Sequence, residues 1–209
     1  MAALGLFAQA PQPPAKEPPS TEAKGMAPRE AAANYQSQAK VGKLTIGAEF
    51  MRHGIPTAQN ELTTEDYVIV EAGVFGAPGD HATLSVGDFS LSINGKKAVP
   101  SVPYGMVLSS VKDPEWEPPE TPSQKKGGSG LSTGGGGNSD PPPLPPKMPM
   151  PLQHAMHLKV QKAAMPEGDR ALPVAGLLFF LYRGQVKSIK SVELQYAGPA
   201  GKATLTLQP

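Results

Sequence analysis

A long stretch of low complexity divides the strand-forming part of this chain and limits how the chain can fold. It reads DPEWEPPETPSQKKGGSGLSTGGGGNSDPPPLPPKMPMP and is rich first in Pro, then in Gly and Ser, then in Pro again. This composition is typical of flexible or extended segments. An unstructured connection of this length is uncommon inside a compact domain. We therefore predict a flexible insertion at about residues 114–150, with β-rich segments that pair across it.

The segment before the insertion has the pattern of an antiparallel sheet. Apolar and polar residues alternate in KLTIGAEFM and in DFSLSI, and DYVIVEAGVFG is rich in β-branched and aromatic residues. Asn94-Gly95 follows DFSLSI and predicts a hairpin with a type I′ turn, because this turn needs positive φ at both central positions. We expect about five strands in this segment, a loop over HGIPTAQNELTTE and the fifth strand over YGMVLSSV.

The segment after the insertion combines one helix with three strands. LQHAMHLKVQKAAMPEGD predicts a helix, because four apolar residues recur on one face: Leu152, Met156, Val160 and Ala163. The run LLFFLY is apolar throughout, which favours a strand covered on both faces. SIKSVELQY and KATLTL predict two further strands. We expect the helix to cover Phe179 or Phe180.

These elements together predict one domain. Three strands alone bury too little apolar surface to be stable, so those after the insertion are expected to join the five before it. Residues 40–209 are therefore predicted to form a single antiparallel β-sandwich of about seven or eight strands with one packed helix. The runs SVGDFSLSINGKKAVPSVPYG and GLLFFLYRGQVKSIKSVELQYAGPAGKATLTL resemble immunoglobulin-like domains of uncharacterised exported bacterial proteins. This resemblance implies an immunoglobulin-like sandwich and brings no catalytic residues.

The start of the chain has the features of an export signal. Residues 2–8 are nearly all apolar, and Ala8-Gln9-Ala10 fits a small-x-small cleavage site. No Lys or Arg precedes Lys16, so we interpret residues 1–10 as the end of a signal peptide whose basic part lies upstream of Met1. Residues 11–39 are rich in Pro and Ala and are predicted to be a linker. We expect a periplasmic or secreted protein.

Composition narrows the kinds of function that we expect. The net charge of +1 argues against a nucleic-acid-binding protein that depends on overall charge. The absence of Cys excludes disulfides, thiolate metal sites and a Cys nucleophile. No apolar run approaches the roughly 20 residues that a transmembrane helix needs. His154 and His157 share one helix face, but two ligands do not complete a metal site, and a solvated face is expected.

Four residues are candidates for binding a partner. Trp116 lies among acidic residues and prolines, where it could bind a cation or a sugar or anchor the loop to the domain, and we favour the anchor. Pro142, Pro145 and Lys147 have the spacing of a polyproline II ligand, although after an export signal we favour a stiff spacer.

The functional expectation follows from these features. No arrangement of a nucleophile with a base is visible, so we predict no enzyme activity, no cofactor and no metal. We expect an exported binding or structural protein of the bacterial cell envelope, with a protein partner there. The alternative is a scaffold whose Pro-rich insertion recruits a partner domain. The ligand and the oligomeric state stay open.

Overall fold

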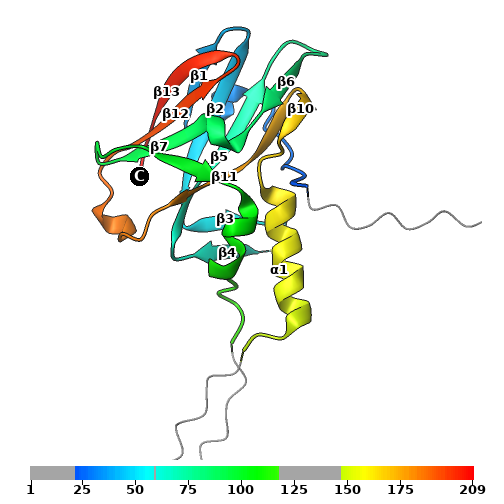
Figure 1. Cartoon of the computed structure of the whole chain (residues 1–209), viewed down its shortest axis with the longest axis vertical. Coiled ribbons are helices and arrows are strands. Elements are labelled where there is room, and N and C mark those ends of the chain that lie inside the picture. Colours follow the sequence, from blue (N-terminus) through cyan, green and yellow to red (C-terminus); the bar gives the residue numbers. More distant parts are fainter. Residues whose placement is uncertain (1–21, 59, 118–146) are drawn as a thin grey trace, which may run out of the picture.

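The computed structural model describes residues 22–58, 60–117 and 147–209. Its centre is an eight-stranded antiparallel sheet with the order β1-β2-β5-β11-β8-β7-β12-β13 (Figure 1). The strands in this order are β1 (Ser37–Val41), β2 (Leu44–Arg52), β5 (Tyr67–Phe75), β11 (Val174–Leu181), β8 (Val99–Val102), β7 (Phe89–Ile93), β12 (Val192–Gly198) and β13 (Gly201–Leu207). Strands from both sides of the insertion are neighbours in this sheet, since β11 pairs with β5 and β12 pairs with β7.

The sheet curls into a barrel-like shape. Its first and last strands, β1 and β13, lie side by side (Figure 1). At this seam the Gln36 side chain links the two edges, because its amide nitrogen donates to the Gln208 carbonyl at 3.1 Å. The same side chain accepts from the Phe50 backbone N–H at 3.4 Å. The inward side chains form the main core, which includes Ile46, Val70, Phe89, Leu91, Phe180, Leu194 and Leu205.

Short elements surround this sheet. A two-stranded sheet joins β10 (Gly168–Ala171) to β6 (His81–Leu84), and a three-stranded sheet has the order β3 (Gly54–Pro56), β4 (Glu61–Thr64), β9 (Val111–Lys112). The α-helix α1 (Met150–Ala163) stands beside the smaller three-stranded sheet (Figure 1). Five 3₁₀ turns complete the described elements: η1 (Ala32–Asn34), η2 (Val86–Asp88), η3 (Tyr104–Met106), η4 (Leu108–Ser110) and η5 (Val186–Ser188).

Strand β11 is covered on both faces, as predicted for LLFFLY. Leu178 and Phe180 belong to the main core inside the barrel. Leu177 and Phe179 belong to a second core outside it, together with side chains of α1, β3 and β4. Because side chains alternate along a strand, one apolar run serves both cores. The prediction that the helix covers Phe179 or Phe180 is confirmed for Phe179.

The predicted linker over residues 11–39 is wrong for residues 22–39, because Met26 bridges to Ala175 of β11, Tyr35 packs on the sheet and residues 37–39 belong to β1. Tyr35 is only 6% exposed. Its ring lies over Gly47 and Gly73, which pair across β2 and β5. A Cβ atom at Gly73 would lie 2.5 Å from the Tyr35 hydroxyl oxygen, and one at Gly47 would lie 2.6 Å from the ring. Because neither glycine has a side chain, the Tyr35 ring can lie directly on the backbone of β2 and β5, and the N-terminal segment can cross the sheet there.

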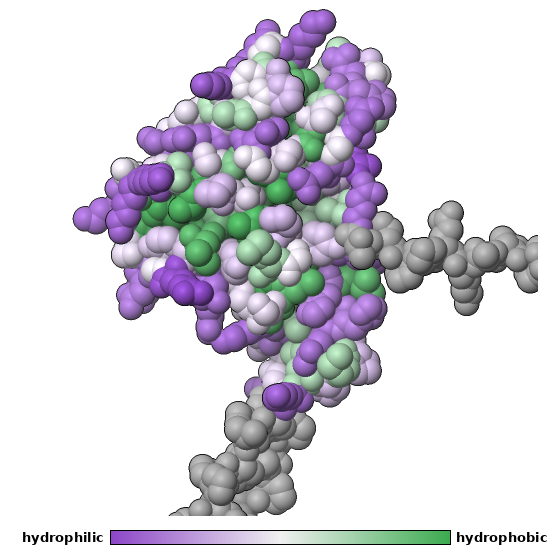
Figure 2. Space-filling model, viewed as in Figure 1, coloured by the Kyte–Doolittle hydropathy of each residue, from purple (hydrophilic) through white to green (hydrophobic). Residues whose placement is uncertain are grey.

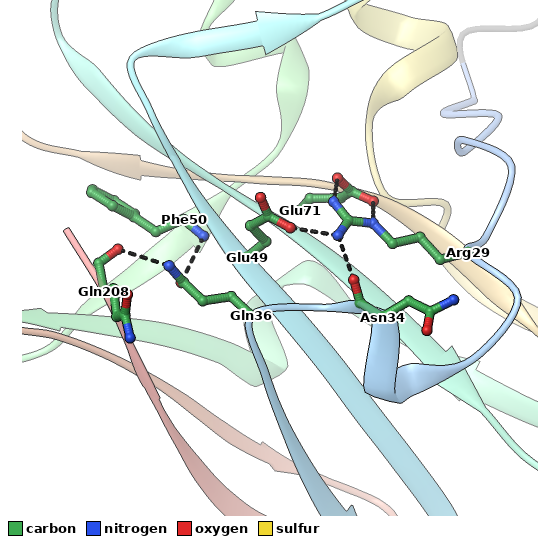
Figure 3. A network of polar contacts seen from close by, with 7 residues as sticks. All are labelled: Arg29, Asn34, Gln36, Glu49, Phe50, Glu71 and Gln208. Carbon is green, nitrogen blue, oxygen red and sulfur yellow. Dashed lines mark hydrogen bonds and ion pairs between the residues drawn. The ribbon is translucent and has the colours of Figure 1, made fainter.

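Arg29 fixes the same segment by charge (Figure 3). Its guanidinium donates to both carboxylate oxygens of Glu71, at 3.2 and 2.7 Å, and to Glu49 at 2.5 Å. It also donates to the Asn34 carbonyl at 2.8 Å and lies 4.4 Å from the centre of the Tyr35 ring. Burial lowers the pKa of Arg29, but the bonds to Glu71 and Glu49 outweigh it and raise the pKa above its ordinary value. The guanidinium is therefore a permanent charge between two carboxylates.

Other predictions for single segments met different outcomes. HGIPTAQNELTTE is not only a loop, because it contains β3 and β4. YGMVLSSV is not a strand but forms η3 and η4 before the short β9. Within the predicted insertion, residues 118–146 lie outside the described residues, as does the predicted signal over residues 1–10. The mainly β, antiparallel fold with one packed helix is confirmed. The prediction was seven or eight strands; the described residues form eight strands in the large sheet and five short strands outside it.

The hairpin after β7 has the predicted turn geometry. Asn94 and Gly95 have φ values of 54° and 68°, and the Lys96 N–H donates to the Ile93 carbonyl at 3.1 Å. Gly95→Val should lower the free energy of unfolding by about 1–3 kcal/mol, because a β-branched residue resists positive φ. Denaturant unfolding measures this. Gly105→Val is the matched control, since Gly105 has equally open surroundings without the positive φ; an equal loss at both positions would contradict the turn assignment.

Candidate binding groove

A groove of about 690 Å³ lies between α1 and the segment that leads from η3 to Trp116. Its apolar surface comes from both sides and consists of Leu108, Val111, Trp116, Met148 and Met156. Its remaining lining is polar or small: Gly105, Ser109, Lys112, Asp113, Gln153 and His157. In Figure 2, hydrophobic residues appear in patches across the middle of the visible face, between hydrophilic ones.

Trp116 is held in the groove by a short chain of hydrogen bonds. The Asp113 side chain accepts from the Glu115 N–H at 3.0 Å, and the Trp116 N–H donates to the Asp113 carbonyl at 3.2 Å. The same carboxylate accepts from the Asn60 side chain at 3.3 Å. Lys159 of α1 in turn donates to the Asn60 oxygen at 3.0 Å. The turn that carries Trp116 is thus tied both to the start of β4 and to the helix.

The helix supplies the opposite wall. Pro149 and Pro151 favour a helix start here, since proline is tolerated in the first turn. Gln153 donates from its side chain to the Met148 carbonyl at 2.8 Å, which places Met148 against the groove. Met156 is 7% exposed and joins the second core. The groove therefore has a floor that is continuous with a packed core.

Charges at the rim are mixed. Lys112 pairs with Glu65 of the β4–β5 turn at 2.6 Å, and both side chains are exposed. Asp113 faces Asn60, and His157 is half-buried beside Met156. A rim with both signs of charge around an apolar floor is suited to an uncharged apolar group more than to an ion.

The predicted partner-binding residues have different outcomes. Trp116 lines the groove and is half-buried, and its predicted role as an anchor of the loop stays a prediction. Lys147 is exposed and precedes the groove residue Met148. Pro142 and Pro145 lie outside the described residues, and the polyproline interpretation stays a prediction. Leu108 is a groove residue that the sequence analysis misses, because the pattern of YGMVLSSV predicts a strand where the structure has η3 and η4.

The histidines do not assemble into a larger cluster. His154 is exposed, and His81 lies 3.3 Å from Asp169 at the surface. Within residues 22–58, 60–117 and 147–209, no three His, Asp or Glu side chains are placed to hold a metal ion. No helix of this part is both long and apolar enough to cross a membrane.

One further group of ionisable side chains lies where β12 ends. Burial raises the pKa of Asp88, and the charge of Glu167 adds to this effect. Glu167 is held by the Val86 N–H, which donates to its carboxylate at 3.0 Å. Burial also raises the pKa of Tyr196, which stays a neutral hydroxyl. These side chains lie apart from the groove, whose lining includes none of them.

Comparison with family models, with curated proteins and with solved structures gives no match.

Proposed function

We propose that this protein is an exported, non-enzymatic binding protein of the bacterial cell envelope and that it takes an extended apolar segment of a partner protein into the groove beside α1. The observation that carries the proposal is the half-buried Trp116 on an apolar floor that includes Met148 and Met156. Tryptophan is enriched among residues that dominate binding energies. Methionine adapts to irregular apolar partners.

The strand beside the groove favours a peptide segment over a small molecule. β9 is the outer strand of the sheet β3-β4-β9, and its two residues, Val111 and Lys112, both line the groove. An outer strand offers backbone donors and acceptors to an added strand. An extended segment could pair with this edge while its apolar side chains enter the groove, which is how peptides commonly add to sheets.

The fold and the location of the protein are part of the same proposal. The resemblance of SVGDFSLSINGKKAVPSVPYG to immunoglobulin-like domains supports an immunoglobulin-like arrangement of the curled sheet. The Ala8-Gln9-Ala10 pattern supports export. Fractionation of cells that express the tagged gene, including its upstream sequence, tests export. Tagged protein in the periplasm or the medium is the expected result. Protein confined to the cytoplasm would contradict the proposed export but would not affect the proposed peptide binding in the groove.

Peptide selection tests the groove. Random peptides displayed on phage are selected on the wild-type protein, synthesised with a fluorophore and titrated by anisotropy. Trp116→Ala should weaken binding by about 30-fold, which corresponds to about 2 kcal/mol for a central aromatic contact. Val186→Ala is the control, because Val186 is a half-buried apolar residue that does not line the groove.

Three results would contradict this part of the proposal. These are a selection that yields no peptide above background, enriched peptides that lack apolar residues, and a Trp116→Ala variant that binds as tightly as the wild type. Circular dichroism of the Trp116→Ala variant shows whether its fold is retained.

A further inference from the structure

One end of the barrel carries a cluster of exposed basic side chains. The β7–β8 turn there bears Lys96 and Lys97, and the segment after β11 bears Arg183, Lys187 and Lys190. All five side chains are exposed. The whole chain has a net charge of only +1, so the positive charge of this end comes from where these side chains lie and not from an excess of basic residues in the chain.

Hydrogen bonds hold the two basic segments together. Asn94 donates from its side chain to the Ser188 carbonyl at 2.9 Å. Its side-chain oxygen accepts from the N–H groups of Lys190 at 2.6 Å and Ser191 at 3.2 Å. Its own N–H donates to the Ser191 carbonyl at 2.9 Å. The lysines are therefore presented by a fixed scaffold, although the residues lie about ninety positions apart in the sequence.

Little negative charge offsets this surface. Arg183 pairs with Asp66 at 3.2 Å, so it contributes less than the lysines. Glu193 on β12 is a further exposed carboxylate next to this end, because it pairs in register with Ser92 just before the turn, and the terminal residue Pro209 accepts from Arg52 at 3.4 Å in the small cavity there. No salt bridge joins Lys96, Lys97, Lys187 or Lys190 to a carboxylate among the described residues, and their charge is open to solvent.

The chemistry of this surface favours a broad anionic layer over a single anion. The lysine ammonium group is a compact point charge and cannot form the bidentate hydrogen bonds with which the arginine guanidinium binds one phosphate. The cavity at this end, between Arg52 and Lys187, is shallow at about 220 Å³. Leu181 is 47% exposed and directly precedes the basic segment, which adds an apolar contact beside the charges. Basic side chains around exposed apolar ones are typical of surfaces that rest on anionic lipids.

Nucleic acid is the less suitable partner. Unspecific binding of single strands uses exposed aromatic rings on which bases stack. The aromatic residues Tyr67 and Tyr182 near this end are both half-buried, and their hydroxyls are engaged with the Met106 carbonyl at 3.3 Å and with Ser188 at 3.1 Å. We propose that the basic end of the barrel, formed by Lys96, Lys97, Lys187 and Lys190 with Leu181 beside them, docks on the surface of a membrane that contains anionic phospholipids. This goes beyond the proposed groove function and does not depend on it.

Vesicle binding tests this proposal. The full chain is sedimented with vesicles of equimolar phosphatidylglycerol and phosphatidylcholine, and with vesicles of phosphatidylcholine alone. Binding is expected only to the anionic vesicles and should fall steeply between about 0.1 M and about 1 M salt, as screening shortens the range of the interaction. Each Lys→Gln substitution at the four positions should weaken binding about fivefold, which corresponds to about 1 kcal/mol per lysine near an anionic surface.

Matched controls lie at the other end of the barrel. Lys43 and Lys202 are also exposed lysines, in and after the turns that lie opposite. Lys43→Gln and Lys202→Gln should leave vesicle binding unchanged. The proposal is overturned if wild-type protein does not bind anionic vesicles, if the controls weaken binding as much as the four substitutions, or if a labelled oligonucleotide binds more tightly than the vesicles and depends on the same lysines.

Discussion

Arg29→Ala should lower the free energy of unfolding by about 3 kcal/mol, the lower end of the range for breaking a buried ion pair, because Glu71 is buried whereas the Arg29 side chain is 30% exposed. Glu49 and Glu71 lie directly opposite each other on β2 and β5. Arg29 contacts both carboxylates, at 2.5 and 2.7 Å, and Glu71 is buried. Without the guanidinium, two like charges face each other across neighbouring strands, which is destabilising. Denaturant unfolding of the wild type and the variant measures the loss.

Two control variants separate charge from packing. Glu49→Gln in the Arg29→Ala background should recover part of the lost stability, because it removes one of the repelling charges. Arg183→Ala removes an exposed ion pair with Asp66 and should cost less than about 1 kcal/mol. Similar small losses for Arg29→Ala and Arg183→Ala would contradict the role assigned to Arg29.

Met156→Ala should lower the free energy of unfolding by about 2–4 kcal/mol, the usual cost of truncating a long buried side chain. Met156 is the apolar residue of α1 that belongs both to the second core and to the groove. Phe179, which is 1% exposed, lies in the same core. Chemical denaturation followed by circular dichroism measures the loss.

The neighbouring position is the control for Met156. His157 is half-buried at the rim of the groove, and His157→Ala should change the free energy of unfolding by no more than about 0.5 kcal/mol. If the two substitutions had equally small effects, α1 would not be part of the core. A larger loss for His157→Ala would reverse the assignment of the two helix faces.

Periodicity predicted the long elements because burial follows it. The alternation in KLTIGAEFM, residues 177–180 of the apolar run LLFFLY and the helical spacing of Met156, Val160 and Ala163 correspond to side chains that are buried in the structure. Leu152 of the predicted helix face and Leu181 of the apolar run are each 47% exposed, so the prediction was wrong for these two residues. The Asn94-Gly95 turn was predictable because its backbone geometry depends on two adjacent residues. These features need no knowledge of distant parts of the chain.

The N-terminal segment was misjudged because its stability depends on partners that are distant in sequence. Arg29 pairs with carboxylates 20 and 42 residues away, and the surrounding composition has no apolar periodicity. Gly47 and Gly73 were a usable signal, since glycine inside a strand often marks a close approach of another group. The Tyr35 ring, which packs against both glycines, could not be identified from the sequence, because Gly47 and Gly73 are brought together only by the pairing of β2 with β5.

The groove was only partly predictable. Trp116 drew attention as a single aromatic residue among prolines and acids, but its neighbours come from three separate elements. The pattern after Pro103 predicts a strand, whereas the structure has η3 and η4 there, and Leu108 lines the groove together with Met148. β3 and β4 were missed because they have only three and four residues and contain or follow Gly and Pro.

The fluorescence of Trp116 tests the groove most directly, because it is the only tryptophan in the chain. A selected peptide that binds with measurable anisotropy is added to wild-type protein, and the emission and its quenching by acrylamide are recorded. Since the peptide would cover the half-buried indole, emission should move to shorter wavelength and quenching should decrease. A peptide that binds but leaves both the emission and the quenching of Trp116 unchanged would contradict the proposed binding groove.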